Sequence, residues 1–133
     1  PVAPPTATPA PAPAPPKEYQ ANDALKSIHF AFDKADIRAG DVKILDANAA
    51  WLKANSNQLV LIEGHCDERG TSEYNLSLGE RRAKAAMNYL ISAGIEAGRI
   101  TTISYGKERP VCSEHNEACW SRNRRDHFLT KER

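Results

Sequence analysis

The stretch that decides the fold is EGHCDERGTSEYNLSLGERRAKAA, residues 63–86. It begins as the end of an apolar strand, passes through a polar turn and continues into a helix. We expect that helix to start near Ser77 and to end at Gly94, because glycine commonly terminates helices. Its apolar residues recur at the spacing of one helical face: Ala83, Ala86, Met87 and Leu90. Flanking segments must therefore supply the strands on which this face packs.

The patterns on either side of this stretch predict those strands. Alternating or continuous apolar residues indicate strands at 27–32, 58–65, 99–106 and 125–131. Helical spacing predicts a helix at 41–55, and a short helix fits at 114–122. The resulting order predicts an α+β fold, with a small mixed parallel and antiparallel sheet and two main helices packed on one face.

The N-terminal segment has a different composition. The run PVAPPTATPAPAPAPP at positions 1–16 holds all but one of the prolines, so it cannot form a packed element. We interpret residues 1–24 as a Pro/Ala-rich linker and residues 25–133 as one domain. A proline-rich segment has a reach of about 3 Å per residue, which favours a tether over a passive tail.

Composition excludes several classes of function. The net charge is +1, so binding to nucleic acid through bulk electrostatics is not favoured. The chain contains no continuous apolar run of the length that crosses a bilayer. It starts with proline, so we expect any export signal to lie outside it. No phosphate-binding loop or nucleophile motif is present, which makes an enzyme the weaker hypothesis.

Two groups of residues could bind a metal. His65 and Asp67 point the same way at a strand end, but a zinc site needs more ligands. Cys112, His115 and Cys119 have ligand-like spacing but supply only three ligands, so a disulfide between the two cysteines is the better interpretation. We therefore expect no metal and no cofactor.

Asp67 in the turn and Arg82 on the helix allow two interpretations. They could form a salt bridge that ties the turn to the helix. They could instead line a pocket walled by Leu78 and Phe32 that binds a ligand end carrying both an ammonium and a carboxylate. The residues alone do not favour either.

Four motifs resemble the OmpA-like peptidoglycan-binding family, and most closely its peptidoglycan-associated lipoproteins. These motifs are FAFDKADI, GHCDERGTSEYNLSLGERRA, SYGKERP and NRR, in this order, from residue 27 to the C-terminus. The resemblance implies non-catalytic binding of meso-diaminopimelate, a residue of the peptidoglycan stem peptide whose free end carries both charges. It implies six ligand contacts, which are Asp67, Arg82, Phe32, Asp33, Leu78 and Asn75, and a mainly structural role for NRR.

The resemblance also implies a cellular setting. Such lipoproteins bind TolB in the Tol–Pal system of envelope integrity and cell division, and face the periplasm from the outer membrane of Gram-negative bacteria through an N-terminal lipid anchor. The alternative within the family is the wall-anchoring domain of an outer-membrane porin or of a flagellar motor stator.

Three features depart from the family pattern. Cys66 stands where the family has a small or polar residue, beside Asp67. A Cys112–Cys119 disulfide is not general to the family, but it agrees with a periplasmic location. Asp126 stands where a hydrophobic strand residue is more usual, which leaves the register of the last strand open.

Overall fold

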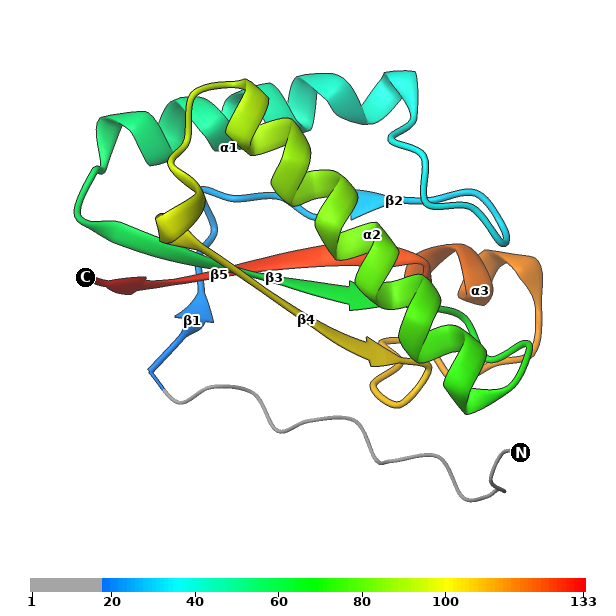
Figure 1. Ribbon diagram of the computed structural model, residues 1–133. Coiled ribbons are helices and arrows are strands. Elements are labelled where there is room, and N and C mark those ends of the chain that lie inside the picture. Colours follow the sequence, from blue (N-terminus) through cyan, green and yellow to red (C-terminus); the bar gives the residue numbers. More distant parts are fainter. Residues whose placement is uncertain (1–17) are drawn as a thin grey trace, which may run out of the picture.

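The computed structural model describes residues 18–133, which form one sheet covered by helices (Figure 1). The strands are β1 Gln20–Ala21, β2 Ile28–His29, β3 Gln58–His65, β4 Ile100–Gly106 and β5 Arg125–Glu132. The helices are α1 Val42–Ala54, α2 Ser72–Ser92 and α3 Glu117–Asn123, with the 3-10 turns η1 Ala39–Asp41 and η2 Ala97–Arg99. The Pro/Ala run at 1–16 lies outside the described residues.

The sheet is mixed, as predicted. Its strand order is β1-β5-β3-β4, and β2 also pairs with β5. β5 runs antiparallel to β1, β2 and β3, whereas β3 and β4 are parallel and are joined through α2. The predicted α+β class and the predicted order of the main elements are therefore confirmed.

α1 and α2 cover the same face of the sheet (Figure 1), and the hydrophobic core lies between them and the strands. Ala83, Ala86 and Leu90 of α2 are fully buried in that core, and Met87 packs against it. The predicted apolar stripe is thus confirmed. In the part of the chain that the structure describes, no helix combines the length and apolarity needed to cross a bilayer.

The predicted start of the second helix near Ser77 is wrong, because α2 begins at Ser72. Thr71 is its N-cap, and the Thr71 hydroxyl accepts a hydrogen bond from the backbone N–H of Tyr74 at 3.1 Å. Such a cap satisfies a backbone donor that has no partner within the helix. The added turn brings Asn75 onto the helix.

The predicted strand at 27–32 is too long, because only Ile28 and His29 form β2. Phe30 still donates its backbone N–H to the carbonyl of Arg124, at 2.9 Å. The chain then turns at Asp33, whose φ of +61° is left-handed. Phe32 consequently leaves the core and is 53% exposed.

β5 pairs at one end with β1, a strand that the sequence pattern did not predict. β1 lies within the stretch assigned to the linker, and its Gln20 and Ala21 pair with Thr130 and Leu129 of β5. At the other end of β5 the register is regular, with Asp126 opposite Gly64. Asp126 is completely buried there.

Candidate ligand-binding site

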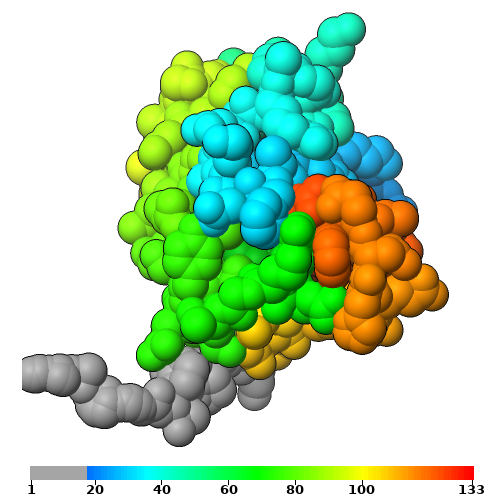
Figure 2. Space-filling model, turned by 90° about the vertical axis from the view of Figure 1, so that its right-hand side faces the viewer, coloured from blue at the N-terminus to red at the C-terminus, as the bar shows by residue number. Residues whose placement is uncertain are grey.

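The structure brings all six sequence-predicted site residues to one pocket of about 380 Å³. Phe32 and Asp33 come from the loop after β2, and Asp67 comes from the turn after β3. The other three, Asn75, Leu78 and Arg82, lie along one face of α2. Figure 2 shows the side of the molecule where these segments meet the α3 region. Cys66, Arg69, Gly70 and Tyr74 complete the lining.

The turn that carries Asp67 is held by side chains from two elements. Asn75 donates from its amide to the carbonyls of Arg69 and Thr71, at 2.8 and 3.0 Å. Lys107 donates to the carbonyl of Gly70 at 2.6 Å, where a φ of +98° requires glycine. Asn75 therefore positions the turn and does not point freely into the pocket.

Arg82 is 1% exposed and forms the floor of the pocket. Its Nε donates to the carbonyl of Lys34 at 2.8 Å, and its two Nη atoms donate to the carbonyls of His65 and Ala31 at 3.0 and 3.1 Å. These contacts leave two of the five N–H groups of the guanidinium without a protein partner among the described residues. The interpretation of Asp67 and Arg82 as a salt bridge is wrong, because Arg82 bonds to backbone carbonyls instead.

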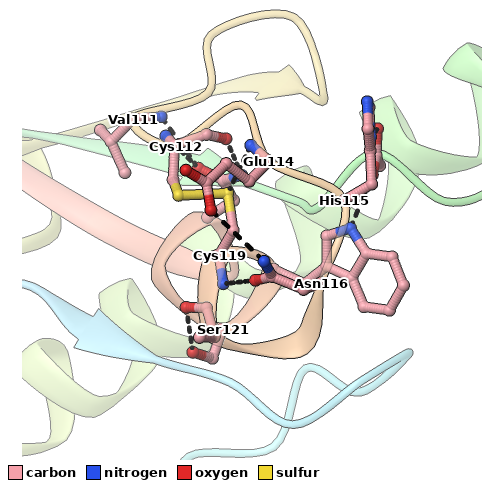
Figure 3. The surroundings of a disulfide bond; sticks show 11 residues. Val111, Cys112, Glu114, His115, Asn116, Cys119 and Ser121 are labelled. Atoms are coloured by element: carbon pink, nitrogen blue, oxygen red, sulfur yellow. Dashed lines mark hydrogen bonds and ion pairs between the residues drawn. A yellow bond between two sulfur atoms is a disulfide. The ribbon is translucent and has the colours of Figure 1, made fainter.

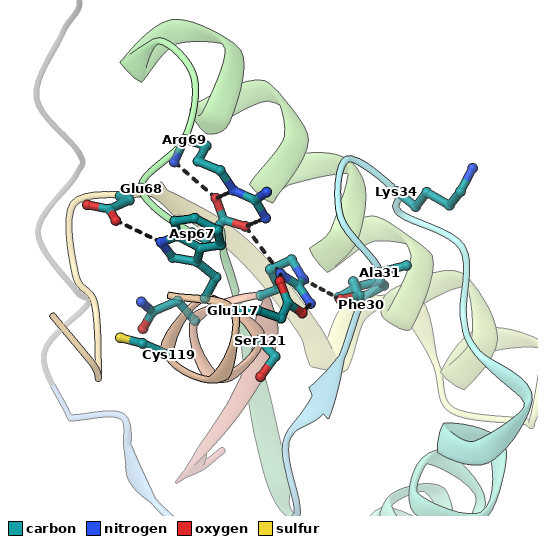
Figure 4. Close-up of polar contacts among 12 residues, drawn as sticks. Phe30, Ala31, Lys34, Asp67, Glu68, Arg69, Glu117, Cys119 and Ser121 are labelled. Atoms are coloured by element: carbon teal, nitrogen blue, oxygen red, sulfur yellow. Dashed lines mark hydrogen bonds and ion pairs between the residues drawn. The ribbon is translucent and has the colours of Figure 1, made fainter. Parts of the chain in front are cut away.

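The Asp67 carboxylate is 4% exposed and is paired with two other arginines (Figure 4). Arg69 donates to it from Nε at 3.2 Å, from Nη2 at 2.8 Å and from its backbone N–H at 3.0 Å. Arg124 donates from Nη1 at 3.4 Å. Burial alone would raise the pKa of Asp67, but the hydrogen bonds from Arg69 and Arg124 outweigh it and lower that pKa, so the group is ionised.

Arg124, in the NRR motif, joins the start of β5 to three other segments. Its Nε donates to the carbonyl of Phe30 at 2.8 Å, which ties the start of β5 to the loop after β2. Its Nη2 pairs with Glu117 of α3 at 2.8 Å. Through Nη1 it also adds positive charge beside Asp67.

Arg69 and Trp120 belong to the site but were not predicted. The Arg69 guanidinium lies 3.8 Å from the centroid of the Phe32 ring and 4.1 Å from that of Trp120. Trp120 in turn donates from its indole N–H to Glu68 at 2.7 Å. The sequence does offer a signal for the pairing of Arg69 with Asp67, because the two residues are only two positions apart. Nothing in the sequence indicates that the α3 tryptophan would reach this turn.

The segment before α3 is held by a disulfide between Cys112 and Cys119, whose Cα atoms are 5.4 Å apart (Figure 3). Asn116 caps α3 by accepting the backbone N–H of Cys119 at 2.9 Å. His115 on this segment pairs with Glu68 at 2.7 Å. The disulfide segment thus forms one side of the turn that carries Asp67.

The remaining candidates for chemistry have structural partners. Cys66 is buried and donates its thiol to the carbonyl of Asn75 at 3.2 Å, and burial raises the pKa of that thiol to about 11. His65 pairs with Glu63 at 3.3 Å. Within residues 18–133, no three His, Cys, Asp or Glu side chains are grouped as metal ligands. The site offers paired charges and an apolar wall, which suit binding.

The chain belongs to the OmpA family, whose members match it over residues 29–124. The peptidoglycan-associated lipoprotein of Haemophilus influenzae is 52% identical over 99 residues, which make up 74% of this chain and 65% of that protein. The protein of the same name from Pseudomonas aeruginosa is 47% identical over 102 residues, 77% of this chain and 60% of that protein. The chain spans about two thirds of the length of such relatives or less. The family resemblance found in the motifs is confirmed.

Solved structures agree with this assignment. The peptidoglycan-associated lipoprotein from Burkholderia pseudomallei has a TM-score of 0.77 at 39% identity, covering 79% of this chain and 89% of that one. The C-terminal domain of MotB from Helicobacter pylori has a TM-score of 0.72 at 17% identity, covering 82% of this chain and 86% of that one. The second likeness shows a shared fold only.

Proposed function

We propose that this domain binds peptidoglycan without catalysis, through the meso-diaminopimelate of the stem peptide. The observation that carries the proposal is that Asp67 and Arg82 line one pocket without pairing with each other. The free end of diaminopimelate bears an ammonium and a carboxylate on one carbon, and the pocket presents a partner for each. Relatives that are 52% and 47% identical are named peptidoglycan-associated lipoproteins, which supports peptidoglycan as the ligand.

The free pocket offers a polar partner for each charged group of the proposed ligand. The ionised carboxylate of Asp67 accepts hydrogen bonds from the ammonium. Arg82 donates its two remaining N–H groups to the carboxylate. Burial lowers the pKa of Arg82, so its charge is incompletely compensated in the free protein and an anion would stabilise it. Leu78 and Phe32 contact the methylene chain, and Asp33, on the rim, adds a second carboxylate.

In the cell this binding would connect the outer membrane to the wall. We place the domain on the periplasmic side, with the Pro/Ala run at 1–16 as the tether to an N-terminal lipid anchor, and we propose TolB of the Tol–Pal system as its protein partner. The alternative, a wall-anchoring domain of a porin or motor stator, shares the fold, as the MotB likeness shows. Identities near 50% to lipoproteins favour the first setting.

Calorimetric titration of a diaminopimelate-containing stem peptide tests the proposal. Asp67→Asn should weaken binding by about 1.5–3 kcal/mol, the value of a hydrogen bond to a charged group. Asp36→Asn is the matched control, since Asp36 is an exposed carboxylate on the same loop as Asp33 and does not line the pocket. A lysine-containing peptide lacks the terminal carboxylate and should bind weakly.

Two results would contradict the proposal. One is a wild-type protein that does not bind the diaminopimelate peptide. The other is an Asp67→Asn variant that is folded and binds as well as Asp36→Asn.

Amidation of the diaminopimelate carboxylate removes the group that Arg82 needs, so the amidated peptide should also bind more weakly. Equal affinity for both forms would remove Arg82 from the proposed contacts.

A further inference from the structure

We infer that Arg69 occupies the ammonium position of the pocket in the free protein and acts as the residue that selects ligands carrying both charges. This inference rests on the proposed function. It adds a role for a residue that binds none of the ligand groups assigned above.

The Arg69 guanidinium imitates a bound cation. Two of its nitrogens, Nε and Nη2, donate to the two oxygens of Asp67, at 3.2 and 2.8 Å. Its central carbon lies over the rings of both Phe32 and Trp120, so the cation has two aromatic contacts. A ligand ammonium that bonds to Asp67 must take the place of at least one of these donors.

The structure also shows why Arg69 can leave. Its side chain is 33% exposed, and its side-chain hydrogen bonds within residues 18–133 go to Asp67 alone. Phe32, on one side of it, is 53% exposed. Asp67 meanwhile keeps two donors that do not depend on the Arg69 side chain, the backbone N–H of Arg69 and the side chain of Arg124. The turn therefore stays in place when the guanidinium moves away.

The displacement has different consequences for different ligands. A ligand end with an ammonium and a carboxylate replaces the Asp67–Arg69 pair with new pairs, because its carboxylate lies within the field of both Arg82 and the released Arg69. A simple amine takes Asp67 and leaves Arg69 without an anion. Arg69 thus raises the cost of binding for an amine and not for the zwitterion. That difference is the source of selectivity.

The test compares Arg69→Gln with Arg81→Gln, in the 133-residue chain, against diaminopimelate and lysine stem peptides. Arg81 is exposed, lies on α2 beside Arg82 and does not line the pocket, so its replacement removes the same charge without freeing Asp67. We expect Arg69→Gln to bind the lysine peptide about tenfold more tightly, the equivalent of one charge-assisted hydrogen bond. Affinity for the diaminopimelate peptide should change far less, and Arg69→Lys, which keeps a cation, should retain more of the selectivity.

A spectroscopic measurement follows the displacement directly. The protein has two tryptophans, and Trp51→Phe leaves Trp120 as the only reporter. Because Arg69 lies against the Trp120 ring, saturation with the diaminopimelate peptide should change the Trp120 emission when Arg69 is present. The same saturation should have little effect on it in Arg69→Gln.

The outcomes distinguish a failure of the proposed function from a failure of the inference about Arg69. If the wild type binds the diaminopimelate peptide and Asp67→Asn does not, the proposed function stands. If Arg69→Gln then binds the lysine peptide as weakly as wild type does, or weakens both peptides equally, the inference about Arg69 is overturned. A wild type that binds neither peptide overturns both.

Discussion

Gly64 of β3 and Gly79 of α2 lie in direct backbone contact. A Cβ atom on Gly64 would overlap the carbonyl oxygen of Gly79, and a Cβ atom on Gly79 would lie 2.9 Å from the carbonyl oxygen of Gly64. This approach brings α2 so near to β3 that Arg82, on the same face as Gly79, reaches the carbonyl of His65. Two residues without side chains thus set the depth of the pocket floor.

Gly64→Ala should therefore destabilise the protein by at least about 2 kcal/mol, because the added methyl group meets rigid backbone rather than a flexible side chain. Urea denaturation measures the change. Gly98→Ala is the matched control, since a Cβ there meets nothing within 4 Å, and it should be neutral or slightly stabilising. Equal stability of the two variants would contradict the close contact.

Arg82→Lys should destabilise the domain by about 3 kcal/mol or more. Lysine cannot reach three separate carbonyls, so those of Ala31, Lys34 and His65 lose donors, and the His65 carbonyl is in a buried contact. Hydrogen exchange should rise in the loop that follows β2. Arg81→Lys, at an exposed position, should stay within about 0.5 kcal/mol of wild type. An Arg82→Lys protein as stable as that control would show that the carbonyl contacts contribute little.

Asp126 should make stability depend on pH. Burial raises the pKa of this carboxyl well above its usual value, and the charge of Arg82 opposes that shift only in part. Above pH 4 or so the unfolded chain therefore binds fewer protons at this residue than the folded one, so stability decreases as pH rises. The slope from this group is about 1.4 kcal/mol per pH unit at most.

Asp126→Asn removes the titration and keeps the shape. The stability of this variant relative to wild type should increase between about pH 4 and neutral pH, because all other titrating groups are shared. Denaturant midpoints of the two proteins across that range give the difference. A difference that stays constant with pH would mean that Asp126 is ionised, and therefore paired, in the folded protein.

Loss of the Cys112–Cys119 disulfide should lower the free energy of unfolding by about 2 kcal/mol, because the bond closes a short loop and so restricts the unfolded chain. The double replacement Cys112→Ser with Cys119→Ser should show this loss in urea denaturation, and wild type with reductant should match it. Because Trp120 directly follows Cys119, near-ultraviolet circular dichroism should change as well. If reductant has no effect on wild-type stability, the bond does not constrain the unfolded chain.

The main elements could be predicted because their patterns are local. The apolar stripe of α2 and the continuous apolar run of β3 are visible within single segments. The apolar pattern places the start of α2 too late because residues 72–76 contribute nothing to that stripe, whereas the Thr71 cap and Glu73 mark the true start. Capping residues therefore locate this boundary better than the apolar pattern does.

The site could be predicted only in part, since its polar partners come from distant segments. The six residues gather in one pocket as the motifs implied. The partners of Arg82 are backbone carbonyls, which every residue has, so no residue type marks them. The contact of Arg69 with Trp120 joins positions 51 residues apart in the chain and depends on how α3 packs.

The position of β1 has a mechanical consequence. β1 pairs with Leu129 and Thr130 near the end of β5, whereas Arg124, which contacts Asp67, directly precedes the start of β5. A pull applied at the N-terminal side and resisted by a ligand in the pocket would therefore run along the whole length of β5. The two-residue pairing of β1 would be the first to peel away, while the strand contacts of β3 with β5 carry the load in shear. Release of β1 would therefore lengthen the chain slightly before the pulling force reaches the pocket.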